Sequence, residues 1–523
     1  MSAAEVDAKP AQGTIGIHLR EKGRTYALVL LSLVAVFNSA DRAIISILAE
    51  ALKADLHLKD ETIGFLYGTA FATFFTVFGL PIARLADNCR RTKLLAIGLI
   101  GWSAMTTLSG FARNFTELAA ARFGVGLGEA IANPCSHSLI ADYYPKKERA
   151  AALGTYLGGL ALGGGLTVLV GGYLLHYWPT ACGRFGACGL APWQATFFVF
   201  GVPGMVLGLL VSRLRDPVRG AVDGTPFHEV SSSPLSSLLV DLAGVIPPLS
   251  IVRLARLGGA TVALRNFGWG ALIVAAATGL TALTGDAVQW IAVGIGVYAL
   301  LSWCQAVGIR DPEFLSLTFR RRTFLLLLGG AAVAGGIGGG VGFWVIPHAI
   351  RDLHVDPKNA GLTYGVTMAL TAFVGTVGTG WLADRWRRRS TSGQIWVTLL
   401  FFLAPIPFAF TLYLARDQAV FLIGLVGFGL TNNSWSSAIA AQVQEFVLPR
   451  MRATAAASYA LSITLVIFAI GPYTAGKIST ATGSLPTGAL ALYAAAPVAM
   501  ILLILAAGAV RAERREAPPR EAA

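Results

Sequence analysis

Long apolar stretches recur along the whole chain and alternate with short polar segments. A helix needs about 20 mainly apolar residues to cross the hydrocarbon core of a bilayer, and many of these stretches reach or approach that length. The pattern therefore predicts an all-α, polytopic membrane protein. The predicted helices cover residues 26–51, 62–85, 93–112, 116–143, 150–176, 192–213, 268–284, 287–305, 323–348, 360–383, 394–415, 418–446, 452–478 and 487–510.

Two loop sequences of the first half recur in the second half. The pairs are "ARLADNCRRTK" (83–93) with "GWLADRWRRRS" (380–390), and "YPKKERAAA" (144–152) with "LPRMRATAA" (448–456). In the first pair, Asp87 and Asp384 are 297 positions apart. Each pair follows the same helix of a six-helix unit, so we expect two six-helix bundles, at 26–213 and 323–510.

The segment between the two bundles, residues 214–322, contains a further apolar region. It begins as the polar linker "RDPVRGAVDGTPFHEVSSSP" and turns apolar from 268 to 305, interrupted only by "TGD". Basic residues flank the apolar region on both sides, which predicts an extra transmembrane hairpin. The alternative is an amphipathic segment that lies on the membrane surface.

Composition and charge agree with a membrane protein. Of the 523 residues, 55% are hydrophobic and only 13% are charged, whereas about a quarter are charged in a typical soluble domain. The net charge of +13 comes from Lys and Arg between the apolar runs, so it indicates membrane topology and no nucleic-acid partner. We expect cytoplasmic termini (1–25 and 511–523), no cleaved signal peptide, and a place in a bacterial inner membrane.

Two pairs of opposite charges lie inside predicted helices: Asp41 and Arg42 in the first, and Arg122 and Glu129 in the fourth. A charge at the bilayer centre costs about 2.5–3.5 kcal/mol on insertion scales, so such residues usually face a cavity or one another. The first and fourth helices run in opposite directions. At a rise of ~1.5 Å per residue, Asp41 and Arg122 therefore fall at a similar depth.

Spacing also groups polar residues along the fourth helix. Steps of three or four residues predict one stripe on the helix surface, formed by Arg122, Gly126, Glu129, Asn133 and His137. Gly126 has no side chain, so another element can approach between the two charges.

The loop after the second helix of each half resembles the signature of the major facilitator superfamily, Gly-x-x-x-Asp-Arg-x-Gly-Arg-Arg. The copy that begins at Gly380 is close to this signature, with Arg387 in place of the second glycine. The first copy departs further, with Ala83, Asn88 and Arg90 at the first glycine, the first arginine and the second glycine. The resemblance implies two six-helix bundles and a charge network that latches one conformation. Its members here would be Asp87, Arg91, Asp384, Arg385 and Arg388.

Within that superfamily, the first half resembles the Spinster family. The matching stretches are "FNSADR" (37–42), "GWSAMTTLSGFA" (101–112) and "RFGVGLGEA" (122–130). The resemblance implies transport of lysophospholipids, sphingolipid-derived signals or related amphiphiles, with proton coupling in some members. It also places the first and fourth helices around a central cavity. The second half matches only at the superfamily level, and the extra hairpin is a departure.

In that arrangement the four intramembrane charges would form one mixed cluster. We expect Asp41 and Glu129 to carry the coupled proton, and Arg42 and Arg122 to act as charge partners and as contacts for a substrate headgroup. The alternative is a static salt-bridge network that holds the first and fourth helices together. Further polar side chains are candidates for lining the cavity: Asn133, His137, Asn432, Asn433 and Trp435.

These patterns favour a proton-coupled secondary transporter that works by alternating access on an amphipathic, lipid-like substrate. The alternatives are a transporter of small organic anions, such as aromatic or sugar acids, and a drug-efflux transporter. The sequence contains no nucleotide loop, nucleophile elbow or metal-ligand spacing, so we expect neither an enzyme nor a cofactor or metal. The expected partners are the substrate, protons and membrane lipids, with the chain acting as a monomer.

Two cysteines fall in one predicted extracellular loop. Cys182 and Cys188 lie between the fifth and sixth helices, where an oxidising environment would permit a disulfide. The alternative is a pair of unrelated thiols.

Overall fold

The computed structural model describes residues 21–184, 189–219, 222, 234–387, 389–390, 392–432, 435, 439, 442–443 and 452–516. Some predicted site residues lie outside the described part: Asn433, Arg388, Cys188 and the side chains of Asp87, Asp384 and Cys182. Within that part, 11 helices are long and apolar enough to cross a membrane by length and composition. The protein is therefore an all-α, multi-pass membrane protein, as its apolar pattern predicts.

The first half contains six helical rods, four of which are among the 11 helices long and apolar enough to cross a membrane. They are α1 (Glu21–Leu56); α2 (Asp60–Gly64), η1 (Phe65–Thr69) and α3 (Ala70–Asn88) in one rod; α4 (Arg91–Ser109); α5 (Phe115–Glu129) with α6 (Ala132–Tyr143); α7 (Lys146–Arg184); and α8 (Pro192–Ser212).

The second half repeats the arrangement. Its helices are α13 (Arg322–Phe343) with α14 (Val345–Arg351); α15 (Pro357–Asn359), η3 (Ala360–Gly365) and α16 (Val366–Arg387) in one rod; α17 (Gly393–Leu403) with α18 (Pro405–Tyr413); α19 (Gln418–Asn432); α21 (Arg452–Ala469) with α22 (Gly471–Thr482); and α23 (Leu485–Ala491), η5 (Leu492–Ala495) and α24 (Ala496–Glu516).

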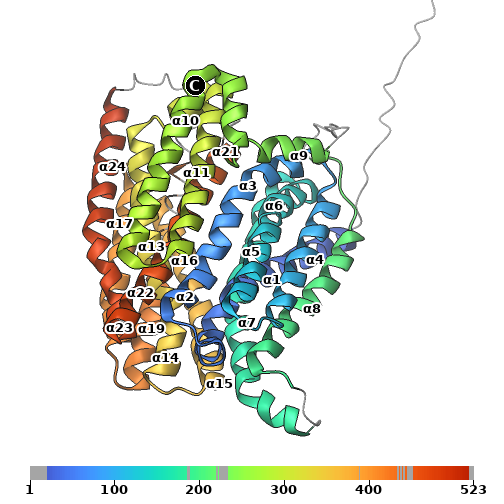
Figure 1. Ribbon diagram of the computed structural model, residues 1–523, viewed down its shortest axis with the longest axis vertical. Coiled ribbons are helices and arrows are strands. Elements are labelled where there is room, and N and C mark those ends of the chain that lie inside the picture. The colour runs from blue at the N-terminus through green and yellow to red at the C-terminus, as the bar shows by residue number, and fades with distance from the viewer. Residues whose placement is uncertain are drawn as a thin grey trace, which may run out of the picture.

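The linker between the halves forms the predicted hairpin, which is longer than the apolar core of its sequence. Two short helices flank it, α9 (Pro234–Leu242) and α12 (Pro312–Leu317), and its arms are α10 (Leu249–Thr284) and α11 (Ala287–Arg310). The arms meet at Gly285, whose φ of 81° is a left-handed conformation that glycine adopts without steric cost. α11 packs against α3 and α21, and α10 packs on α11 (Figure 1). We call the end of the molecule that carries Gly285 the outer end, and the opposite end, where α24 finishes, the inner end.

Several spanning helices are interrupted next to a proline, because proline has no N–H and its ring clashes with the carbonyl four residues earlier. The fourth helix stops at Glu129 and resumes at Ala132, just before Pro134, so the prediction of one continuous helix over 116–143 is wrong. The helix formed by α13 and α14 breaks before Pro347, and that formed by α21 and α22 breaks before Pro472.

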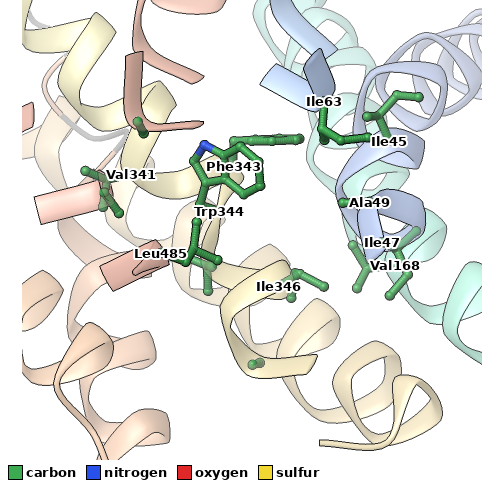
Figure 2. Packing of buried hydrophobic residues seen from close by; sticks show 14 of the residues in the cluster. Ile45, Ile47, Ala49, Ile63, Val168, Val341, Phe343, Trp344, Ile346 and Leu485 are labelled. Carbon is green, nitrogen blue, oxygen red and sulfur yellow. The ribbon is translucent and has the colours of Figure 1, made fainter. Parts of the chain in front are cut away.

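The largest cluster of buried apolar side chains joins the two halves. In Figure 2, Ile45 and Ile63 of the first half lie across from Phe343 and Trp344 of the second half. All four side chains are nearly inaccessible to solvent, with exposed fractions of 0–3%. The two bundles therefore share a packed interface in addition to their own cores.

A topology reporter tests the hairpin. With more than 20 mainly apolar residues in each arm, we expect a reporter inserted at Gly285 to lie on the extracytoplasmic side of the membrane. A reporter at the end of α24 serves as the cytoplasmic control. If both reporters give a cytoplasmic signal, the hairpin lies on the inner surface and does not cross.

Candidate functional site

The charges of the first and fourth helices meet inside the first half. The Nε of Arg42 donates to the Oε2 of Glu129 across 2.8 Å, and the Nη2 of Arg42 donates to the Oδ1 of Asn38 across 2.9 Å. Glu129 is fully buried, whereas the Arg42 side chain is 23% exposed. The Arg42 guanidinium also lies over the Phe71 ring, 4.7 Å from its centroid. Arg42 is therefore the charge of this pair that solvent or a substrate can reach.

Asp41 and Arg122 lie beside each other but make no direct ion pair among the described residues. The Nη2 of Arg122 donates to the backbone oxygen of Asp41 across 2.8 Å, which agrees with the similar depth predicted for the two residues. The Asp41 carboxylate accepts from the Thr106 hydroxyl across 2.7 Å. Both residues are buried, and the Nε and Nη1 of Arg122 have no hydrogen-bond partner within the described part of the chain.

A glycine allows the helices around this cluster to approach. A Cβ added to Gly126, which lies between Arg122 and Glu129 on α5, would meet the carbonyl oxygen of Phe71 at 2.7 Å. The predicted role of Gly126 as a point of close approach is therefore confirmed. Phe71 belongs to α3, so this approach also brings α3 to Arg42.

A cavity of about 360 Å³ lies between the two halves, next to the charge cluster. Its lining residues are Ser39, Ala43, Ser46, Tyr67, Leu160, Gly164, Gly165, Val168, Gly335, Gly338, Gly339, Gly342, Phe343, Ile346, Gly365, Met368, Ala369, Ala372, Asn432, Trp435, Ile467 and Phe468. Arg42 lies on the same side of α1 as Ser39 and Ser46, because positions three and four apart share a helix face. Arg42 is not itself a lining residue, but its helix face makes it the member of the cluster nearest to the lining positions of α1.

The structure separates the predicted cavity-lining residues into two groups. Asn432 and Trp435 line the cavity, and Asn432 donates to the backbone oxygen of Gly338 across 3.2 Å. Asn133 and His137 do not line it. Instead, Asn133 accepts from the Tyr156 hydroxyl, and the His137 ring packs edge-on against the Tyr156 ring. The break between α5 and α6 separates these two residues from Arg122 and Glu129.

A network of ion pairs that was not predicted from the sequence joins the two halves at the outer end. The guanidinium of Arg351, the last residue of α14, lies 2.6 Å from the Oε1 of Glu50 and 2.7 Å from the Oδ1 of Asp60. Lys53 pairs with Asp60 across 2.5 Å, and the Ser479 hydroxyl donates to Asp60 across 2.6 Å. Glu50, Lys53 and Asp60 belong to the first half, whereas Arg351 and Ser479 belong to the second. The sequence shows that the loops at this end contain both acidic and basic residues, but it does not indicate which of them pair.

A repeated glycine motif marks where the helix backbones of the two halves touch. The motif is "GFLYG" at 64–68 and "GLTYG" at 361–365, again 297 positions apart, and each copy falls in a stretch of π-helix. A Cβ on Gly68 would lie only 1.7 Å from the carbonyl oxygen of Phe468. The same close approach occurs for Gly64 with Pro472, Gly361 with Val168, and Gly365 with Gly165 and Val168. This internal repeat was a signal that could have located both contacts from the sequence.

The inner end is more open. A Cβ would meet no atom within 4 Å at Gly154 and Gly158 of α7, or at Gly378 and Gly380 of α16. These two helices touch near the outer end, through Gly361 and Val168, so they separate toward the inner end. The structure therefore has a closed outer end and looser packing at the inner end.

Comparison with known proteins decides the family. Residues 31–469 match the sequence model of the Major Facilitator Superfamily. The chain belongs to this superfamily. Members share the duplicated six-helix architecture described above, and the chain is therefore a transporter-type, multi-pass membrane protein.

Individual relatives within the superfamily differ in their described cargo. The chain is 26% identical over 457 residues to an MFS-type efflux pump of Mycolicibacterium smegmatis (strain ATCC 700084 / mc(2)155), covering 87% of this chain and 85% of that protein. It is 29% identical over 209 residues to a probable L-galactonate transporter of Escherichia coli (strain K12), covering 40% and 43%. It is 25% identical over 218 residues to protein spinster of Drosophila melanogaster, covering 41% and 34%.

A solved structure supports the fold. A bacterial homologue of the human lysosomal transporter Spinster, in an inward-facing and unoccupied conformation, superposes with a TM-score of 0.70 at 22% identity. The match covers 95% of this chain and 99% of that chain. The Spinster resemblance predicted from three short stretches agrees with the sequence match to protein spinster.

Among the described residues, the superfamily signature residues of the inner loops make no contact with the opposite half. Arg91 is buried, forms an ion pair with Asp142, and lies 2.7 Å from the Oδ1 of Asp216. Arg385 is exposed and lies over the Trp381 ring, 5.6 Å from its centroid. A latch between the halves through these residues stays a prediction.

Gly68→Ala tests whether the close backbone contact between Gly68 and Phe468 keeps the outer end closed. The added methyl group would collide with the Phe468 carbonyl, so we expect the outer ends to separate. In a background with Ser479→Cys, an impermeant maleimide added from outside should then label the buried position 479 at least several-fold faster. Gly101→Ala is the matched control, because a Cβ there meets nothing within 4 Å. Equal labelling in both variants would contradict a closing role for Gly68.

Proposed function

We propose that the protein is a proton-coupled secondary transporter that moves an amphipathic, anionic, lipid-like substrate by alternating access. The observation that carries this proposal is the position of Arg42. Its side chain is 23% exposed and belongs to the same face of α1 as the cavity-lining Ser39 and Ser46, while its ionic partner Glu129 is fully buried. Protonation at the buried cluster is thereby linked to the charge that a substrate in the cavity would meet.

Charge balance explains how such a link operates. With Asp41 and Glu129 ionised, the two acids balance Arg42 and Arg122, and the cluster is nearly neutral. Protonating one acid leaves the cluster with a net positive charge, and this charge attracts an anionic headgroup to the exposed part of Arg42. A ligand that prefers one protonation state must in turn favour that state when it binds.

The two acids have different partners. Glu129 accepts from the Arg42 guanidinium, whereas the Asp41 carboxylate accepts from the neutral Thr106 hydroxyl. An ionised carboxylate in an apolar bundle is costly unless a cation pairs with it. We therefore assign the proton to Asp41 and the negative charge to Glu129 in this conformation.

The cavity lining favours an amphiphile over a polyhydroxylated substrate. Most lining side chains are apolar or absent, including Leu160, Phe343, Met368 and Phe468. Among the described lining residues, Ser46 already donates to the backbone oxygen of Phe343 across 2.9 Å. A substrate with many hydroxyl groups would therefore find few free hydrogen-bond partners, whereas an acyl chain would be well solvated.

A transporter of small organic anions is the second candidate, and the named relatives favour it. They include probable transporters of L-galactonate and of galactarate and D-glucarate. In this alternative the same Arg42 would hold a carboxylate of the substrate. A drug-efflux role is the third candidate, because an MFS-type efflux pump matches most of the chain.

Alternating access requires the two bundles to move relative to each other. In this proposal residues 26–213 and 323–510 rotate as units, and the Arg351 network breaks when the outer end opens. The conformation described here then corresponds to the inward-facing state of a monomer whose termini lie in the cytoplasm of a bacterial cell.

Neutralising the acids tests the coupling. Glu129→Gln and Asp41→Asn preserve the shape of the side chain but replace the carboxylate with a neutral group, as protonation does. We expect the variant whose acid carries the coupled proton to lose uptake driven by a pH gradient while it retains substrate exchange. The measurement is uptake and counterflow in proteoliposomes. Arg122→Ala should impair both activities, because it removes the buried cation beside Asp41 and leaves Arg42 as the one arginine of the cluster for two buried acids. If both acid variants keep wild-type proton-driven uptake, the cluster is structural.

A ligand-stabilisation experiment tests the substrate class. In nanodiscs, we expect an anionic lysophospholipid to raise the Tm of the wild-type protein, since a ligand at 100 times its Kd stabilises by about 2.7 kcal/mol. The shift should shrink in Arg42→Gln and persist in Arg256→Gln, an exposed arginine on α10. Stabilisation by galactonate and none by the lysophospholipid would favour the organic-anion alternative.

A further inference from the structure

The hairpin formed by α10 and α11 takes no part in the transport site, yet it covers the line where the two halves meet. α11 packs against α3 of the first half and against α21 of the second half (Figure 1). Contacts continue along this line, because a Cβ at Gly296 of α11 would meet Leu465 of α21 at 2.8 Å. The hairpin therefore touches both bodies that must separate at the outer end during alternating access.

One hairpin side chain bridges the two halves directly. The Oε1 of Gln289 lies 2.6 Å from the Thr69 hydroxyl, which donates to it, and its Nε2 donates to the backbone oxygen of Ala469 across 2.7 Å. Thr69 ends η1 in the first half, and Ala469 ends α21 in the second. Gln289 is only 2% exposed and Thr69 is fully buried. These hydrogen bonds therefore lie in an apolar environment without competing water.

The Ala469 carbonyl is available because the helix is interrupted there. α21 stops at Ala469 and α22 starts at Gly471, next to Pro472. The last carbonyl groups of a helix have no partner within it, and an unsatisfied carbonyl in lipid is costly. The Nε2 of Gln289 supplies the missing donor, and the Thr69 hydroxyl, whose single proton serves either Gln289 or this oxygen, lies 3.0 Å from it.

The remaining polar contacts of the hairpin are divided unequally between the halves. At its tip, Asp286 accepts from the Tyr473 hydroxyl across 2.6 Å and pairs with Lys477 across 2.7 Å, and both partners belong to the second half. Toward the first half, besides the Gln289 bridge, the Thr73 hydroxyl donates to the backbone oxygen of Ala292 across 3.1 Å. An ion pair and a hydrogen bond at its tip thus link the hairpin to the second half. Hydrogen bonds from the Thr69 and Thr73 hydroxyls link it to the first half.

The two arms of the hairpin also hold each other. The Tyr298 hydroxyl of α11 donates to the Oδ1 of Asn266 on α10 across 2.6 Å, and the Asn266 amide donates to Ser302 across 2.9 Å. Both Asn266 and Ser302 are fully buried. The hairpin can therefore move as one unit.

From these contacts we propose that Gln289 is a positioning residue of the transport cycle: it ties the hairpin across the seam between α3 and α21 and so sets the balance between the inward-facing and outward-facing states. The proposal rests on the alternating-access motion of the proposed function, but not on its substrate or its proton coupling. When the outer end opens, Gln289 cannot keep its bonds to both Thr69 and Ala469, because these residues belong to different halves, so the bridge breaks. Weakening the bridge therefore favours the outward-facing state.

Spin-label distances test this balance without any transport measurement. Labels at Lys59→Cys and Thr482→Cys, both exposed at the outer ends of opposite halves, report the opening of the outer end in nanodiscs. Gln289→Met keeps the size of the side chain and removes its hydrogen bonds, and Thr69→Val removes the hydroxyl while keeping the shape. We expect each to raise the ratio of outward-facing to inward-facing molecules roughly 2- to 10-fold, as expected for the loss of one net hydrogen bond.

The control is Thr278→Val on α10, whose hydroxyl donates only to its own helix, to the Val274 carbonyl across 2.8 Å. We expect this variant to leave the distance distribution unchanged. An unchanged distribution in both Gln289→Met and Thr69→Val overturns the proposal, as does a lower Tm with an unchanged ratio of states, which identifies a merely structural role. A shifted ratio in a protein that transports neither substrate class supports the role of Gln289 and counts against the proposed function alone.

Discussion

The closed outer end depends on one requirement: backbone carbonyl groups that lose their hydrogen-bond partners at helix breaks must find new donors. In the bilayer core no water can satisfy a free carbonyl, so each break in a spanning helix must be compensated by another part of the protein. The break before Pro347 frees the Phe343 carbonyl, and Ser46 of the opposite half donates to it. The break before Pro472 leaves the Ala469 carbonyl to Thr69 and Gln289. Two irregular points of the second half are thus satisfied by residues outside it.

These polar contacts act over a short range, so they require the helix backbones to be very close. The glycines of "GFLYG" and "GLTYG" permit that closeness, because any side chain there would collide with the facing carbonyl groups. Since the two motifs are related by the internal repeat, both seams of the outer end are built in the same way. The ion network around Arg351 then adds charge pairing at the outer surface. Packing, backbone hydrogen bonds and charge therefore all favour the same closed end.

The charge cluster differs from the contacts of the outer end, because all of its residues lie within one half. Asp41, Arg42, Arg122 and Glu129 all come from the first bundle, whereas the cavity is lined by both bundles. In the proposed function, a proton taken up by this cluster changes charge on one side of the cavity only, so it alters how that bundle contacts a substrate without rearranging the other. The second half contributes Asn432, Trp435 and small residues, which shape the cavity but carry no charge.

The sequence by itself determined the architecture and the identity of the intramembrane charges. Apolar length fixes which segments cross the membrane, and the repeated aspartate loops show the duplication, because both are local properties of the chain. The internal repeat also contained the seam glycines at 64–68 and 361–365, although only their contacts reveal what they do. Helix rise placed Asp41 and Arg122 at one depth, and the structure brings them together.

Only the tertiary structure decided which partner each charged or polar group has. Arg42 pairs with Glu129 while Asp41 meets the neutral Thr106, and no spacing along the chain distinguishes these pairings from the reverse. The break at Pro134 turned Asn133 and His137 away from the charge stripe, which a continuous helix would have kept in line. The Arg351 network and the Gln289 bridge join residues roughly 200 to 400 positions apart in the sequence. The Gln289 bridge also lies where three helices pack together. Such pairings depend on how rigid helices pack, and helical periodicity reports only which face of its own helix a residue occupies.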